Sequence, residues 1–276
     1  MTGDWLTAAL ALRRDGRPGV LVTLAQVRGH APRDAGAKMV VTTQDAHGSV
    51  GGGNLEASAV SRARAMLGEG ARVPELLDLE LSEHAPARHG VQCCGGRVRV
   101  LLEPLTARPV VAVFGAGHVG HELARILSRL DLVLHLVDSR AELLSDDRLG
   151  VLAGGTAEVV ARPAVAPESV LAGLPAGAHV VVMTHDHAED LAVCDQALRR
   201  PDLGRVGLIG SVAKWARFRR TLEGAGHDPA AVAAISCPIG IPDAGAKEPA
   251  AIAVAVAAEV LSWLRVDAGP ALPAGG

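Results

Sequence analysis

The chain of 276 residues is poor in aromatic side chains, which make up 2% of it and include no tyrosine. Proteins that bind single-stranded nucleic acids use such rings as stacking platforms. The chain also has no excess of basic residues, because 27 Lys and Arg stand against 30 Asp and Glu and leave a net charge of −3. A nucleic-acid-binding domain usually shows the opposite balance. Both absences argue against a nucleic acid as partner.

Long apolar runs and leader signals are missing as well. The longest apolar run, at 250–264, is interrupted by Glu259 and is too short to cross a bilayer. Residues 1–12 do not combine a basic region, an apolar stretch and a cleavage site as a signal peptide does. Four cysteines in a chain of this length do not form a disulfide scaffold. We therefore expect a cytoplasmic protein without membrane contact.

Apolar residues are plentiful, at 49%, and the length suits two domains. Strands are expected in the first part at 19–27, 38–43, 77–81 and 98–102, with helices at 4–14 and 54–67. From residue 110 onward, apolar strands alternate with helices, which is typical of βαβ units in a parallel sheet. The predicted fold class is α/β, with an N-terminal mixed α/β domain and a C-terminal Rossmann-like parallel-sheet domain. The expected boundaries are 1–107, 108–266 and a flexible tail at 267–276.

The strongest motif is a glycine turn between the strand at 110–114 and the helix that follows it. It reads Gly115-Ala-Gly117-His118-Val-Gly120, and Asp138 ends the next strand. Glycines allow a tight turn and a close approach of a phosphate, to which the helix N-terminus presents N–H groups. The acidic residue is placed to accept a hydrogen bond from a ribose or another hydroxyl. The motif predicts a pocket for an anion or a nucleotide.

A second polar segment, Thr184-His185-Asp186-His187-Ala-Glu-Asp190, follows the strand at 179–183. Open α/β sheets bind their ligands at this end of their strands. Two His and two Asp residues could ligate a metal or contact a polar ligand. Alternatively, Asp186 only caps the next helix and the histidines lie on the surface.

Two further turns resemble anion sites. Gly210, Ser211 and Lys214 lie where a strand opens into a helix, which suggests an anion nest with one cation. In the first part, Gly51-Gly52-Gly53-Asn54 precedes a helix that we expect Asn54 to cap, with Glu56 close by. The second turn is equally compatible with a flexible connection.

The pair Cys93-Cys94 precedes Gly95-Gly96 and a strand. Adjacent cysteines rarely bridge to each other, and the spacing is not that of a zinc site. The flanking glycines suggest accessible backbone, so a reactive thiolate and an inert pair both stay open. Cys194 lies within a predicted helix and is expected in the core.

Together these motifs resemble the xanthine dehydrogenase accessory protein family (XdhC/CoxI) over about residues 5–264. In the first domain the resemblance is carried by Ala31-Pro32-Arg33, by Gly52-Gly53-Asn54-Leu55-Glu56 and by Cys94-Gly95-Gly96. In the second it is carried by the glycine turn, the Thr-His-Asp-His segment, the Gly-Ser…Lys turn and Pro238-Ile239-Gly240 ahead of Glu248-Pro249. Some relatives carry a Cys where Asn54 stands, so a thiol role falls here to Cys93 and Cys94.

The resemblance implies an accessory protein that is not an enzyme. Members bind the molybdenum cofactor (molybdopterin), help a cysteine desulfurase convert its oxo ligand to the sulfido form, and deliver it to a xanthine dehydrogenase or a related molybdenum hydroxylase. Cys93 and Cys94 are then the candidate molybdenum contacts. The residues that would contact the cofactor are Gly52, Gly53, Glu56, Cys93, Cys94, Gly115, Gly117, His118, Gly120, Asp138, His185, Asp186, His187, Gly210, Ser211 and Lys214.

Two other classes of protein stay open at this point. The glycine turn with Asp138 would also suit an NAD(P)-dependent oxidoreductase, although an acid–base partner for hydride transfer is placed only at His185 or Lys214. The His/Asp segment would suit a metal-dependent hydrolase. Neither class accounts for the first domain. A homodimer is expected, because the last helix is apolar and two-fold oligomers are common.

Overall fold

The computed structural model describes residues 4–81, 96–241 and 247–267. The chain divides between Ala107 and Arg108 into two compact units, which we call the first and the second domain. Each is described by itself below. No helix in the described ranges is long and apolar enough to span a membrane.

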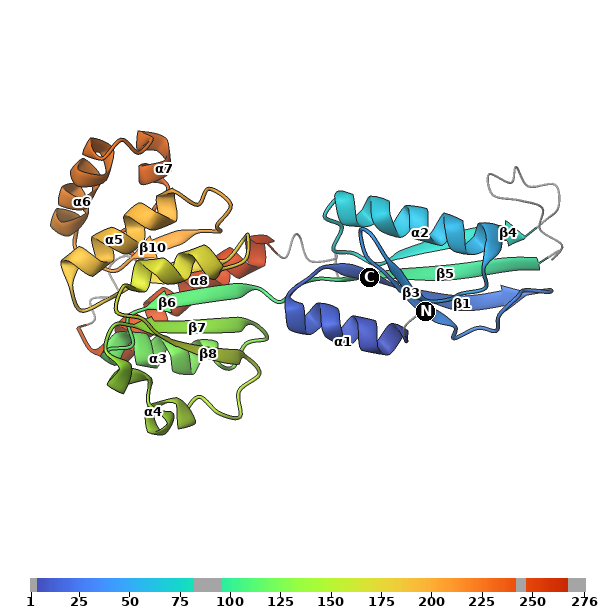
Figure 1. The fold of residues 1–276 in the computed structure, drawn as a ribbon, viewed down its shortest axis with the longest axis horizontal. Helices are drawn as coiled ribbons and strands as arrows, with labels where there is room; N and C mark the ends of the chain where they lie inside the picture. Colours follow the sequence, from blue (N-terminus) through green and yellow to red (C-terminus); the bar gives the residue numbers. More distant parts are fainter. Residues whose placement is uncertain (1–3, 82–95, 242–246, 268–276) are drawn as a thin grey trace. The chain divides into compact units, whose positions relative to one another are not determined.

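The first domain is a five-stranded antiparallel sheet with two helices (Figure 1). The order of its strands is β3-β2-β1-β5-β4. Its elements are α1 (Trp5–Asp15), β1 (Gly19–Arg28), β2 (Lys38–Val41), β3 (Ala46–Gly48), α2 (Gly53–Gly68), β4 (Glu75–Leu81) and β5 (Gly96–Leu105).

One face of this sheet packs against α2 and forms the core of the first domain. Apolar residues alternate along the strands, so that Val20, Val22 and Leu24 of β1 all lie on this face. The apolar stripe of the helix, formed by Leu55, Ala59, Ala63 and Met66, is buried against them.

The opposite face of the sheet is covered only in part, by α1. This helix begins with Asp4, whose carboxylate accepts a hydrogen bond from the Thr7 N–H at 3.3 Å, and ends at Gly16 in the left-handed conformation. It contacts β1, β2 and β3. On this face β4 and β5 also present the charged side chains Asp78, Glu80, Arg97 and Arg99, which are considered below.

The second domain is a parallel five-stranded sheet in the order β10-β9-β6-β7-β8. When the strands are numbered 1 to 5 along the chain and read from the β8 edge, the order is 3-2-1-4-5. This is the arrangement of a Rossmann fold, and it confirms the predicted class. Its strands are β6 (Val110–Phe114), β7 (Val133–Asp138), β8 (Glu158–Pro163), β9 (His179–Val182) and β10 (Val206–Leu208). Its helices are α3 (His118–Leu127), η1 (Ala141–Leu144), α4 (Asp146–Gly150), η2 (Pro167–Gly173), α5 (His187–Leu198), α6 (Val212–Gly224), α7 (Pro229–Ala233) and α8 (Pro249–Asp267).

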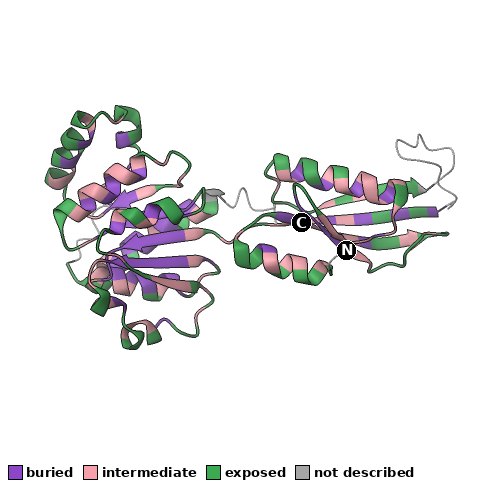
Figure 2. Cartoon of the chain, in the orientation of Figure 1, coloured by how far each residue is buried: buried purple, intermediate pink, exposed green. Residues whose placement is uncertain are grey.

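Helices cover both faces of this sheet, so its central strands are buried throughout (Figure 2). On one face, α3 and α8 pack on Val113 of β6 and Leu136 of β7. On the other face, α5, α6 and η2 pack on Phe114 and Val182. Cys194 of α5 lies in this second core, as expected.

The structure departs from the predicted elements in three places. Residues 46–48 form the edge strand β3, which is not among the expected strands, because they pair with Met39–Val41 of β2. The short helices η1, α4, η2 and α7 have no long apolar period and were not predicted. The cap of α2 is Gly52 rather than Asn54, because the chain enters the helix through three glycines with positive φ and the helix begins one residue earlier.

Candidate functional site

The parallel sheet brings four of the predicted segments to one edge. The strands β6, β7, β9 and β10 all point the same way, and the glycine turn, Asp138, the Thr184 segment and Gly210 follow their carboxyl ends. The chain order reverses between β6 and β9, which is where open α/β sheets bind ligands. The candidate site of the second domain therefore lies at this switch point.

The three glycines of the turn have different roles. A Cβ atom on Gly115 would lie 2.2 Å from the Met183 carbonyl oxygen, and its φ is +113°. A Cβ on Gly120 would lie 1.8 Å from the carbonyl oxygen of Gly115. The fold therefore requires glycine at both positions, because β6 packs closely on β9 and α3 packs closely on the turn.

Gly117 is not required by the fold. It precedes α3 with φ −65° and ψ −167°, an extended conformation that any residue adopts. The nearest atom to a Cβ placed there is Nη2 of Arg140, 4.0 Å away. The absent side chain leaves the N-terminus of α3 open to a ligand, and this cradle fits a phosphate group.

Asp138, the predicted partner of a ligand hydroxyl, is already satisfied by the protein. It is 3% exposed. Its Oδ2 accepts hydrogen bonds from the Ala116 N–H at 2.7 Å and from Nη2 of Arg140 at 3.1 Å. Its Oδ1 accepts from the backbone N–H and from Nε of Arg140, both at 2.9 Å. A carboxylate has about four acceptor positions, so none is left for a ribose hydroxyl.

The same contacts set the ionisation of Asp138. Burial works to raise the pKa of this carboxyl, but the hydrogen bonds from Arg140 and Ala116 outweigh it and lower the pKa below 3.8. The carboxylate is therefore charged at neutral pH and holds Arg140 in place.

Arg140 is the site residue that the sequence analysis missed. Its guanidinium donates hydrogen bonds to Asp138, and its Nη2 lies 4.0 Å from the position that a Cβ atom on Gly117 would take. An arginine has five N–H donors, of which two are used on Asp138, so donors remain for an anion at the turn. Its position two residues beyond the acidic strand end was a usable signal, because arginines near this place bind phosphate in some Rossmann folds.

The Thr184 segment is organised by a buried ion pair. Asp190 is 1% exposed, and its Oδ1 accepts from the N–H and the hydroxyl of Thr184 at 2.9 and 2.8 Å. Its other oxygen pairs with Nζ of Lys214, which also donates to the Ile209 carbonyl at 2.9 Å. Lys214 thus joins the ends of β9 and β10, and its charge is used inside the protein rather than on an anion.

The histidines and Asp186 beside it remain on the surface. Asp186 caps α5, accepting from the N–H groups of Glu189 and Ala188 at 3.1 and 2.6 Å, and these bonds lower its pKa. His185 lies 3.7 Å from the Glu189 carboxylate, and His187 packs edge-on against Phe218. Among the described residues, no three His, Cys, Asp or Glu side chains are placed to hold a metal. Asp190 is paired with Lys214 and is therefore not available as a ligand to a metal at this segment.

The turn after β10 acts mainly as a helix cap. The hydroxyl of Ser211 accepts from the backbone N–H of Lys214 at 3.1 Å and so caps α6. A Cβ on Gly210 would lie 2.8 Å from Cδ of Lys214, so the glycine makes room for that side chain. Ser211 is exposed at the edge of the sheet where the strands end, so it stays a candidate for a ligand contact.

In the first domain, Glu56 closes the glycine loop on itself. Its Oε2 accepts from the Gly52 N–H at 3.1 Å and from the Ser49 hydroxyl at 2.7 Å. Cβ atoms on Gly52 or Gly53 would meet no atom within 4 Å. Glycine is therefore favoured at these two positions by their positive φ values, and the backbone at the start of α2 is left exposed.

The family motifs of the first domain meet at one end of its sheet. A Cβ on Gly51 would lie 3.4 Å from Pro32, which places the loop after β1 beside the glycine loop. A Cβ on Gly96 would lie 2.2 Å from the carbonyl oxygen of His30, which places the start of β5 beside the same loop. Cys93 and Cys94, which precede Gly96 in the chain, lie outside the described residues.

The two described cysteines are not thiolates. Burial raises the pKa of Cys194 to about 12 and that of Cys237 to about 11. Thiols with such values are neutral at physiological pH and are poor nucleophiles and metal ligands.

The strand order and the open glycine turn define a Rossmann-type ligand-binding domain, joined here to an antiparallel α/β domain. Residues 111–260 match the model of the XdhC Rossmann domain, and residues 12–79 match the model of the XdhC and CoxI family. The chain belongs to the XdhC/CoxI family, as the sequence motifs indicated.

Two curated relatives come from Escherichia coli strain K12. The uncharacterized protein YqeB is 26% identical over 255 residues, which cover 92% of this chain and 45% of the relative. The molybdenum cofactor insertion chaperone PaoD is 36% identical over 110 residues, which cover 39% of this chain and 33% of the relative. The matched part is less than half of each relative. A crystal structure of a xanthine dehydrogenase from Bacillus halodurans aligns over 98% of both chains at 17% identity and a TM-score of 0.49.

Proposed function

We propose that this protein binds the molybdenum cofactor as cargo, protects it and inserts it into a xanthine dehydrogenase or a related molybdenum hydroxylase. Membership of the XdhC/CoxI family and the likeness to PaoD, a molybdenum cofactor insertion chaperone, support this role. The observation that carries it is the open position at Gly117 beside Arg140. The open position at Gly117 is not required by the fold, and both features suit an anionic ligand.

The cargo is a pterin with a phosphate and a molybdenum held by a dithiolene. In the proposal, the first N–H groups of α3, at His118, Val119 and Gly120, donate to the phosphate, because an α-helix leaves them without an internal partner. The Arg140 guanidinium neutralises part of the phosphate charge and gives it a fixed orientation. Asp138 acts as a positioning residue, since it holds Arg140 through three hydrogen bonds.

Further contacts are proposed from exposed groups at the same edge of the sheet. His185 and Ser211 are exposed and lie after β9 and β10, where they can contact the polar edge of the pterin.

Cys93 and Cys94 are proposed as molybdenum contacts, since thiolates are suitable ligands for a soft metal centre. In the same proposal, this protein supports the sulfuration of the cofactor by a cysteine desulfurase. It is also proposed to assemble as a homodimer.

NAD is a less favoured ligand. In an NAD-binding Rossmann fold, the acidic residue at the end of the second strand receives a ribose hydroxyl. Here all acceptor positions of Asp138 are used by Ala116 and Arg140. An oxidoreductase would also need a placed proton donor. Of the two candidates, Lys214 is held in a buried ion pair, which leaves only the exposed His185.

The decisive experiment uses protein purified without oxygen from a host that makes the cofactor. Free cofactor is added, the excess is removed by gel filtration, and bound pterin is measured through the fluorescence of its oxidised derivative. Molybdenum is measured in parallel by elemental analysis. We expect close to one pterin per chain. Protein that retains nicotinamide dinucleotide and no pterin would overturn the proposal and restore the oxidoreductase alternative.

A further inference from the structure

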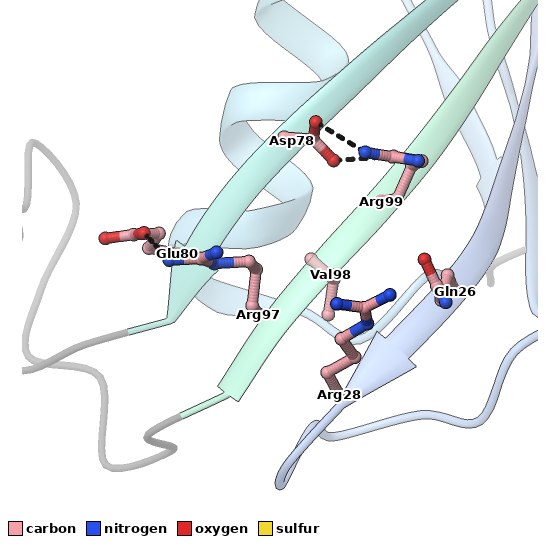
Figure 3. A pocket seen from close by; sticks show the side chains of 7 residues that line it. All are labelled: Gln26, Arg28, Asp78, Glu80, Arg97, Val98 and Arg99. Atoms are coloured by element: carbon pink, nitrogen blue, oxygen red, sulfur yellow. Dashed lines mark hydrogen bonds and ion pairs between the residues drawn. The ribbon is translucent and has the colours of Figure 1, made fainter.

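The first domain carries a hollow on the face of its sheet that α2 does not cover. It has a volume of about 470 Å³ and is lined mainly by polar side chains of β1, β4 and β5. Figure 3 shows it from close by. Ligand pockets for small molecules fall in the range of about 300–1,000 Å³. The residues that line it are Gln26, Arg28, Asp78, Glu80, Arg97, Val98 and Arg99.

The strand register sets these side chains in two rows. Arg97 of β5 stands between Glu80 of β4 and Arg28 of β1. Arg99 stands likewise between Asp78 and Gln26. The row of Arg97 therefore contains two arginines directly opposite each other and one carboxylate. Like charges in this arrangement destabilise a sheet unless an anion lies between them.

The hydrogen bonds show which donors are occupied. Arg99 forms a bidentate pair with Asp78, at 2.7 and 3.0 Å, and is satisfied. Arg97 gives Glu80 a single hydrogen bond, from Nη2. No dashed line reaches Arg28 in Figure 3, so it forms no hydrogen bond or ion pair with the other residues that line the hollow. The donors left over are thus concentrated on Arg28 and Arg97, with the Gln26 amide nearby.

We propose that this hollow is a second anion-binding site, which holds a phosphate or carboxylate group of a small molecule between Arg28 and Arg97. Arginine presents its N–H groups as a planar fork that matches both oxyanions. The two carboxylates in the hollow do not cancel this attraction, because Asp78 and Glu80 are each paired with their own arginine. The charged residues that line the hollow have a net charge of +1, because three arginines stand against two carboxylates. An anion between Arg28 and Arg97 would reduce the repulsion between their charges.

The site can be tested by nuclear magnetic resonance on the full chain, through the Nε–H signals of its arginines. Inorganic pyrophosphate and succinate are titrated separately at low chloride concentration. We expect the signals of Arg28 and Arg97 to shift with saturation, and the more tightly bound probe identifies a phosphate or a carboxylate ligand. The substitution Arg28→Gln should weaken binding about tenfold or more, as expected for the loss of a charge-assisted pair.

Two controls make the outcome specific. Arg72 is an exposed arginine of the same domain that does not line the hollow, so Arg72→Gln removes the same charge and should leave the affinity unchanged. Gly117→Val alters only the turn of the second domain and should leave the shifts of Arg28 and Arg97 intact, which separates this site from the proposed cofactor site. Absence of shifts at Arg28 and Arg97, or equal losses in Arg28→Gln and Arg72→Gln, would overturn the proposal.

Discussion

Replacing Gly117 by valine separates a glycine kept for a ligand from one kept for the fold. The backbone at this position has φ −65° and ψ −167°, at the edge of the extended region and outside the left-handed region that favours glycine. The nearest atom to the new Cβ is Arg140 Nη2 at 4.0 Å, an ordinary van der Waals distance to the end of a flexible side chain. The free energy of unfolding should therefore stay within about 0.5 kcal/mol of the parent value, as for surface substitutions that meet no special feature.

Ligand binding should respond quite differently. The branched side chain fills the space through which a phosphate reaches the first N–H groups of α3. Two hydrogen bonds to a charged group contribute about 3 kcal/mol or more, at about 1.5–3 kcal/mol each. Each 1.4 kcal/mol corresponds to about a factor of ten in affinity, so the loss should be about a hundredfold or more.

The assay pairs equilibrium dialysis with the free cofactor, under exclusion of oxygen, with urea unfolding followed by circular dichroism. Gly120→Ala is the matched comparison, because its Cβ would lie 1.8 Å from the Gly115 carbonyl oxygen. That variant should lose about 2 kcal/mol of stability, within the range of about 1–3 kcal/mol for overpacked sites. Parental affinity of Gly117→Val for the cofactor would refute the assignment of the phosphate to this turn.

Three further substitutions test other parts of the structure. Asp138→Asn should cost about 2 kcal/mol at pH 7, because an amide cannot accept all the hydrogen bonds that this buried carboxylate receives. Because folding lowers the pKa of Asp138, its contribution to the free energy of unfolding is present above pH 3.8 and declines as the pH falls through the folded-state pKa. Urea unfolding at successive pH values should therefore show the stability difference between the parent and Asp138→Asn becoming smaller in acid. Lys214→Met should cost about 3 kcal/mol, because it leaves Asp190 as an unpaired buried charge. The double variant with Asp190→Leu should recover part of this loss in the same unfolding measurement, because it removes the buried charge but also the hydrogen bonds from Thr184. Joint replacement of Cys93 and Cys94 by alanine should weaken cofactor retention with an unchanged circular dichroism spectrum, and unchanged retention in dialysis would rule out the thiolate contacts.

Local patterns predicted most of the second domain. The apolar strands at 110–114 and 179–183 and the glycine turn between strand and helix need only short-range information, since buried parallel strands appear as continuous apolar runs. The stripe of α2 was equally visible, because helical periodicity is local. The edge strand β3 was not visible, because its three residues become a strand only by pairing with β2.

The candidate site divides in the same way. The sequence identified Asp138, Asp186 and Lys214 as polar groups near strand ends. The structure places them at the end of β7, at the N-cap of α5 and in the first turn of α6. Their partners were beyond reach of sequence patterns. Asp190 pairs with Lys214 across 24 positions, and Asp138 bonds to Ala116 across 22 positions. Such contacts determine whether a charge faces a ligand or is neutralised inside the protein.

The sequence by itself determined the family, the two-domain organisation of strands and helices, and the glycine turn, because each is encoded in residues close together along the chain. Only the tertiary structure decided that Gly117 is the one glycine of that turn without a steric need, that Arg140 lies beside it, and that Asp138 has no acceptor left for a hydroxyl. The tertiary structure also placed Arg28 opposite Arg97 in the hollow of the first domain. The physical reason is that close packing and strand register bring distant residues within hydrogen-bonding distance, and those distances decide which polar groups stay available for a ligand.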